Sequence, residues 1–416
     1  MTIAESLFLR LLLVLPLAAL AAPVHAQEKP PEAGTNKDDD DDVTKAGLKD
    51  PYTGGEPAAM AAAGVVAYAP FPWADGKTTA SLETVLGERR ILWLETAHFR
   101  IGLSLRSVAW PEDQQKRKAL QDEIKALRKK LPKIPERPKK LDPWIRLHLY
   151  AQRLENLYAD VQKLLSVTDA DFPGKGKEPR DGPYLGMPDK YLVLLFQKKS
   201  DCARYLDRFC GVKEDRSMRW YHDKTHQMLS VVAAEGLEGF DEAGLHGQVV
   251  YAVSHNLLNG YNGYFYNLPL WLDEGIAHWF ARQVPSDIVN VQILDTEAVA
   301  EDRMNDWPVK VRRRAQHDGA WFPFEKMAAW TKFDEMGYLA HSQSWSRVDY
   351  LLALDPKKVA QMVKQLKALP PPVNGAVPPA EVATLAQKLL IELFELDAAT
   401  FDKKWREWVL KTYPKK

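Results

Sequence analysis

Three polar side chains, those of His255, Asn259 and Glu274, lie within or directly beside two largely apolar stretches of the chain. The first stretch, Gln248–Leu258, is expected to begin a helix on which His255 and the Asn four residues later share one face. The second has the sequence Pro-Leu-Trp-Leu-Asp-Glu-Gly-Ile-Ala over 269–277. A buried Glu is rare unless it is paired, so we expect Glu274 to face His255 from the next helix.

These residues match the frame of a zinc peptidase in which two positions are replaced. Zinc peptidase helices carry His-Glu-x-x-His, where the two His bind the metal and the Glu activates the zinc-bound water. Here the helix carries His255-Asn256-Leu257-Leu258-Asn259, and the string Trp-Leu-Asp-Glu-Gly-Ile-Ala resembles the helix that provides the third ligand in gluzincins of the peptidase MA-like group. The resemblance spans roughly residues 90–410 and implies an α+β, gluzincin-like fold.

The two replacements remove specific chemistry. The carboxamide of Asn256 does not titrate, so it cannot take a proton from water as a general base. Asn259 is a poor zinc ligand beside imidazole, thiolate or carboxylate. His255 and Glu274 alone remain of the ligands that the resemblance implies, whereas catalytic zinc uses three protein ligands and a water. We therefore expect no cofactor, or weakly bound zinc, and little or no peptidase activity.

His278 leaves two interpretations open, because it lies one helical turn after Glu274 on the same face. It could be a displaced third ligand, which would give the metal set His255, Glu274 and His278. It could instead hydrogen-bond Glu274 and be structural, which we prefer because a ring one turn along usually points past the metal. Asp273 and Glu274 diverge by about 100° on a helix, so they are not expected to act as a pair.

Further residues are candidates for the cleft rather than for the metal. In gluzincins a Tyr or His from a later helix often stabilises the oxyanion, and Tyr338 and His341 fit that description in Gly337–Trp345. Asn256 and Asn259 would line the same cleft. His222 and His226 flank an expected hairpin turn and are groove candidates only.

Hydrophobic periodicity predicts an α/β half followed by a helical half. Strands and a hairpin are expected at 90–94, 98–105, 191–196 and 219–232. Helices are expected at 111–131, 143–165 and 201–210, and from residue 242 to the end with an interruption at 370–379. The pattern thus predicts an N-terminal α/β subdomain with a small sheet over 61–240, and a helical subdomain over 241–416 that carries the degenerate motif.

Residues 1–26 are typical of a secretory signal peptide. Leu7–Ala22 is almost entirely apolar, with Arg10 near its start, and Val24-His25-Ala26 has small residues where a signal peptidase cleaves. The apolar run is shorter than the roughly 20 residues of a membrane span. We expect a periplasmic or secreted protein without a transmembrane segment.

Residues 27–60 are expected to be a disordered acidic linker. They include Pro and Gly residues and the run Asp38–Asp42, and they contain few large apolar side chains that could compensate for the cost of ordering the chain.

Two cysteines, Cys202 and Cys210, fall at the two ends of an expected helix. Eight residues of helix rise about 12 Å, which exceeds the roughly 7 Å between the Cα atoms of bridged cysteines. We expect two free, buried thiols.

The charge balance limits the class of partner. The chain has 56 basic and 56 acidic residues, which gives no electrostatic case for nucleic acid.

The leading hypothesis is an exported, hydrolytically inactive pseudopeptidase whose cleft binds or scaffolds peptide or cell-envelope material. The alternative is an active metal hydrolase that uses His255, Glu274 and His278, and a third is a structural protein with a closed cleft.

Overall fold

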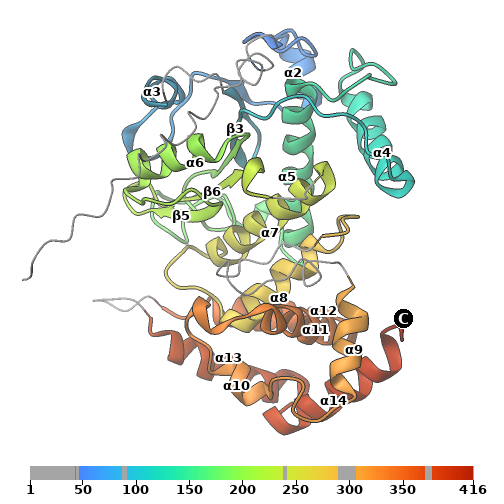
Figure 1. Cartoon of the computed structure of the whole chain (residues 1–416). Coiled ribbons are helices and arrows are strands. Elements are labelled where there is room, and N and C mark those ends of the chain that lie inside the picture. Colours follow the sequence, from blue (N-terminus) through green and yellow to red (C-terminus); the bar gives the residue numbers. More distant parts are fainter. Residues whose placement is uncertain are drawn as a thin grey trace, which may run out of the picture. The chain divides into compact units, whose positions relative to one another are not determined.

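A computed structural model of the chain describes residues 43, 46–86, 91–237, 241–288, 306–370 and 377–415, and these form a mixed α/β structure (Figure 1). The signal peptide predicted over 1–26 lies outside the described residues, as do residues 27–42 of the predicted linker. Among the described residues, no helix has both the length and the apolar character needed to cross a membrane.

The strands form one six-stranded mixed sheet in the order β1-β2-β3-β4-β6-β5. Their bounds are β1 Ala67–Tyr68, β2 Leu92–Glu95, β3 Phe99–Leu103, β4 Tyr191–Phe196, β5 Met218–His222 and β6 Gln227–Ala233. The pairs β3–β4 and β4–β6 are parallel, and the pairs at both ends of the sheet are antiparallel. The hairpin places Trp220 opposite Leu229, so β5 forms one edge of the sheet.

Alternate residues of the central strands enter two separate apolar cores, because successive strand residues point to opposite faces. Leu192, Leu194 and Phe196 of β4 pack with α3 (Thr79–Val85) and α6 (Lys199–Tyr205). Tyr191, Val193 and Leu195 pack on the other face with α5 (Pro143–Leu165) and α7 (Glu242–Gly260). Helices therefore cover both faces of the sheet. The α7 helix extends to the site from the face that it covers together with α5.

The other main regular elements of the described chain are helices. The first of them are α2 Pro57–Ala63 and α4 Gln114–Lys130. Those after α7 are α8 Leu270–Ala281, α9 Trp307–Ala315, α10 Phe324–Ala328, α11 Tyr338–Leu354, α12 Pro356–Leu366, α13 Pro379–Phe394 and α14 Ala398–Thr412. Because α7 packs on both β6 and α8, it connects the two predicted subdomains within one compact unit.

Most predicted elements agree closely with the observed ones. The bounds of α5 are those predicted, since Asp142 caps its first turn and Pro143 occupies its first position. The strand at 191–196 and the hairpin are confirmed. The helix predicted at 201–210 differs: α6 ends at Tyr205, and Leu206–Cys210 form a π-helical turn that closes at Gly211 with a positive φ of 70°. Cys202 and Cys210 are free, but Cys210 is only partly buried.

Ordered structure begins before residue 60, where the predicted linker ends. Asp50 is buried and lies 3.0 Å from the Nε2 atom of His148 on α5. Its carboxylate also accepts hydrogen bonds from the hydroxyls of Thr53 and Tyr68. The expectation of disorder is therefore wrong for this part, because polar anchoring onto α5 compensates for the lack of large apolar residues.

Candidate functional site

The predicted site lies where α7, α8 and α11 meet. Asp241 caps α7 by accepting from the Gly244 amide, and the helix runs to Gly260, so His255, Asn256 and Asn259 are all helical. On α8, Gly275 allows close approach of α11. A Cβ atom at this position would lie 2.5 Å from Val348 Cγ2 and 2.6 Å from the Ser344 carbonyl oxygen. The glycine of the Asp-Glu-Gly string therefore sets the distance between these two helices.

His255 faces Glu274 as predicted. Its Nε2 atom is 3.5 Å from Glu274 Oε1, and its Nδ1 atom is 2.8 Å from Asp273 Oδ1. These are close contacts rather than aligned hydrogen bonds, since neither ring nitrogen has an aligned partner among the described residues. Burial and the nearby Arg219 charge lower the pKa of His255, but Asp273 and Glu274 outweigh them and the net shift is upward.

Asp273 is thus part of the site, although no pattern in the sequence predicted this. Both carboxylates of the Asp-Glu pair contact one imidazole because His255 presents a different ring nitrogen to each. Adjacent helix residues point about 100° apart, so the carboxylates of Asp273 and Glu274 do not contact each other. The ring of His255 can nevertheless lie between them.

The two Asn residues form hydrogen bonds at the positions where the resemblance implies a Glu and a His. Asn256 Nδ2 donates to Ser230 Oγ on β6 at 2.8 Å. Asn259 Nδ2 donates to both oxygens of Asp273 at 2.9 and 3.0 Å, and its Oδ1 accepts from the Leu268 amide at 2.8 Å. Both side chains are buried. Asn259 therefore connects α7 to the start of α8.

Glu274 is the centre of a buried polar cluster. Its Oε1 atom faces His255, while its Oε2 atom accepts a hydrogen bond from Tyr251 at 2.7 Å and lies 3.2 Å from His341 Nδ1. Burial alone would raise the pKa of Glu274, but the neighbouring His255 and His341 rings outweigh it and hold that pKa well below its usual value. Glu274 is a carboxylate in this environment.

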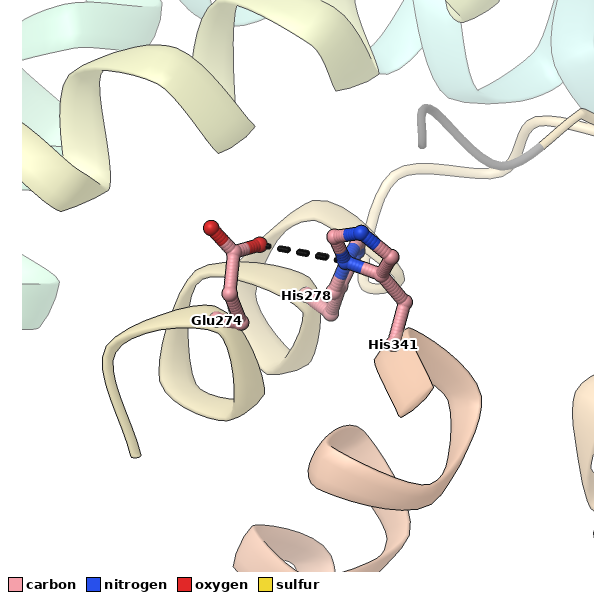
Figure 2. A group of neighbouring side chains, drawn as sticks. All are labelled: Glu274, His278 and His341. Atoms are coloured by element: carbon pink, nitrogen blue, oxygen red, sulfur yellow. Dashed lines mark hydrogen bonds and ion pairs between the residues drawn. The ribbon is translucent and has the colours of Figure 1, made fainter. Parts of the chain in front are cut away.

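His278 and His341 meet at the same carboxylate oxygen (Figure 2). His278 Nε2 is 3.7 Å from Glu274 Oε2 and 3.1 Å from His341 Nδ1, and all three side chains are 0% exposed or nearly so. Burial, followed by the charge of His341, lowers the pKa of His278 well below its usual value. Glu274, His278 and His341 are the residues of the described chain whose ligand atoms are close enough to hold one metal ion.

The ligand positions that the resemblance implies do not fit a metal. The Asn259 carboxamide oxygen accepts from the Leu268 amide and its nitrogen donates to Asp273, so both ends of this weak ligand are already held by hydrogen bonds. The proposed set of His255, Glu274 and His278 is gathered around Glu274, but the two rings contact opposite carboxylate oxygens. His341, predicted as a cleft residue, takes the place that the sequence assigned to His255.

A groove opens next to Asn256. It has a volume of about 490 Å³ and lies between β5, the segment that follows α7 and the loop before α11. The residues that line it include Arg216, Arg219, Trp220, Tyr221, Asn256 and Asp334. Of the four predicted cleft residues, Asn256 lines this groove, whereas Asn259, Tyr338 and His341 do not.

The remaining sequence candidates have other partners. Tyr338 packs edge-on against Trp307, whose ring in turn contacts His278. His222 is buried with Nδ1 2.8 Å from Asp75, and His226 Nδ1 lies 2.8 Å from the Tyr221 hydroxyl. The hairpin histidines therefore do not converge on a metal.

Comparison with known proteins finds no family model that matches this chain and no curated protein that matches it. The geometry of the site and of the groove is therefore the basis for the function of this chain.

Proposed function

We propose that this chain is an exported, gluzincin-like pseudopeptidase that binds peptides in the groove beside α7 without cleaving them. The observation that carries the proposal is the position of Asn256. It lines the groove where a peptidase would hold its general base, and its carboxamide is bound to Ser230. A groove thus remains open beside a residue that cannot activate water.

The groove has the chemistry to hold an extended peptide. One wall is β5, which pairs with β6 on one side and forms the sheet edge on the other. An edge strand offers backbone hydrogen bonds to an added strand, and pockets for alternate side chains then give specificity. Trp220 and Tyr221 supply flat apolar contact area on this wall.

Arg216 and Arg219 favour a peptide that carries a carboxylate. Both line the groove, and Arg219 is close enough to His255 to affect its pKa. A guanidinium binds a carboxylate through two parallel hydrogen bonds. Asp334 is an acidic residue in the same lining, so the cationic character is concentrated at the β5 wall.

Binding and cleavage can be tested together. The purified chain would be incubated with a library of short labelled peptides, with and without acidic residues. Fluorescence anisotropy would measure binding and mass spectrometry would measure cleavage. We expect acidic peptides to bind and to stay intact. Arg219→Gln should weaken binding about tenfold, since a hydrogen bond to a charged group contributes roughly 1.5–3 kcal/mol.

Arg208→Gln is the matched control, because Arg208 is exposed and does not line the groove. Its affinity should equal that of the unmodified chain. Cleavage that a chelator abolishes would contradict the proposal and favour a metal hydrolase. Absence of binding across the library would also contradict it and favour a closed, structural protein.

A further inference from the structure

Three ligand atoms form a nearly equilateral triangle between α8 and α11. The sides are 3.1 Å from His278 Nε2 to His341 Nδ1, 3.2 Å from that Nδ1 to Glu274 Oε2, and 3.7 Å from Glu274 Oε2 to His278 Nε2. Figure 2 shows the carboxylate and the two rings converging, with Glu274 and His278 on one helix and His341 on another. No sequence motif links His341 to the other two.

The triangle has the dimensions of a zinc site. Zinc bonds of about 2.0–2.2 Å in a tetrahedral arrangement separate neighbouring ligand atoms by about 3.3–3.6 Å. The three observed sides lie within about 0.2 Å of that range. Two imidazoles and one carboxylate are also the protein ligands found in many zinc sites.

Without a cation, every arrangement of protons leaves one side of this triangle with two lone pairs or two N–H groups facing each other. A neutral imidazole carries one N–H, so a proton on His341 Nδ1 can serve either Glu274 or His278. The lone pair of His278 Nε2 then points toward a carboxylate oxygen 3.7 Å away. Protons on both inner nitrogens would set two N–H groups 3.1 Å apart. A cation at the centre provides a partner for all three atoms at once.

We propose that Glu274, His278 and His341 bind one zinc ion, which links α8 to α11. This site lies one helical turn beyond the site that the family resemblance implies, and it shares only Glu274 with that site. The three ligands are buried and none of them lines the groove, so the ion is structural rather than catalytic. The proposal is independent of peptide binding in the groove.

The surroundings of the ligands set the expected affinity. The Tyr251 hydroxyl lies 2.7 Å from the same Glu274 oxygen and holds this ligand in place. The outer nitrogens, His278 Nδ1 and His341 Nε2, have no hydrogen-bond partner among the described residues. Partners at these nitrogens usually contribute a factor of about 10–100 in affinity. We therefore expect zinc to bind more weakly than in a zinc enzyme with complete outer hydrogen bonds.

The test measures zinc and cobalt binding to the full chain. Zinc content after dialysis would be measured by mass spectrometry, and Co²⁺ titration would be followed by its visible absorption. We expect one ion per chain and a rise of a few degrees in Tm at about 100 times the Kd for zinc. His278→Gln and His341→Gln should each lower the affinity by at least ~100-fold, since loss of a ligand exceeds loss of its orienting partner.

His255→Gln separates the two sites. It removes a ligand that the family resemblance implies but leaves the three atoms of the triangle in place. Because His255 lies 3.5 Å from the other oxygen of Glu274, the affinity should fall only as for loss of an orienting partner, by about tenfold, which is less than in either ligand variant. Equal loss in His255→Gln, unchanged binding in His341→Gln, or no zinc bound by the folded parent would each overturn the proposal. If the His variants do not fold, X-ray absorption of the zinc-loaded parent decides: two imidazoles and a carboxylate support the site, and any other ligand set contradicts it.

Discussion

Asn259 donates hydrogen bonds from its Nδ2 atom to both carboxylate oxygens of Asp273, at 2.9 and 3.0 Å. The carboxamide thus binds the carboxylate whose other neighbour is the ring of His255. The resemblance would place a second imidazole and a metal ion at this position. Here the polar groups satisfy one another instead, so Asn259 stabilises the contact between α7 and α8 without a metal.

The first prediction compares the two Asn residues. Asn259→Ala removes hydrogen bonds to a buried carboxylate and leaves the Leu268 amide without its partner, so we expect a loss of about 2–4 kcal/mol in the free energy of unfolding. Asn256→Ala removes one hydrogen bond at the groove and should cost about 1 kcal/mol. Urea unfolding measures both, and an equal cost would contradict the structural role of Asn259.

The second prediction concerns the approach of α8 to α11. Gly275→Ala should destabilise the chain, because the added methyl group would lie 2.5 and 2.6 Å from atoms of α11. Overpacking costs about 1–3 kcal/mol, and the better helix propensity of Ala returns about 1 kcal/mol. A net loss with weaker zinc binding is expected. A more stable variant would show that the two helices can separate freely at this point.

The sequence predicts the elements of this fold better than their contacts. The α5 helix follows from Asp142, Pro143 and the spacing of its Leu residues, all of which are local signals. The contact between His255 and Glu274 was also predicted, because it follows from the spacing of residues along the two helices. Each of these predictions uses residues that are near one another in the chain.

His341 could not be predicted as a partner of His278 for the opposite reason. The two residues are 63 positions apart, and their contact depends on how closely α11 packs on α8. The one local signal was Gly275. It indicates close packing against α11, but only the position of α11 shows that a larger side chain would not fit there. The buried Asp50 was missed similarly, since its partner His148 is 98 residues away.

The third prediction is a pH dependence at Lys367. Burial lowers the pKa of Lys367 to about 7, although the Asp273 charge opposes the shift. The amine donates to the carbonyls of Asn259 and Tyr266, beside the end of α7. The unfolded lysine keeps a pKa near its usual value of ~10.4, so above pH ~7 the unfolded chain binds more protons than the folded one.

The cost of burying Lys367 is therefore fully present below pH ~7 and is relieved as the pH rises toward ~10.4. The free energy of unfolding of the parent minus that of Lys367→Met should increase by about 2 kcal/mol between pH ~7 and pH ~9. Lys364→Met on the same helix is the control, because Lys364 makes an exposed contact. A difference that stays constant with pH would show that Lys367 remains charged when folded.

The last prediction restores the motif. Asn256→Glu with Asn259→His rebuilds His-Glu-x-x-His on α7, next to Glu274. The new imidazole must displace the hydrogen bonds of Asn259 to Asp273 and Leu268, so the metal-free variant should be less stable than the parent by about 2–4 kcal/mol. Zinc should then bind through His255, the introduced His and Glu274, with an open fourth position.

The decisive readout is whether zinc binding depends on His255. In the parent chain His255→Gln should lower the affinity only as loss of an orienting partner does, by about tenfold, whereas in the double variant the same substitution should abolish the added affinity. Peptidase activity is a poorer readout, because the oxyanion partner and the groove also have to be in place. A double variant that folds and binds zinc no better than the parent, with no dependence on His255, would show that the three positions cannot converge on a metal, and the gluzincin-like interpretation would fail.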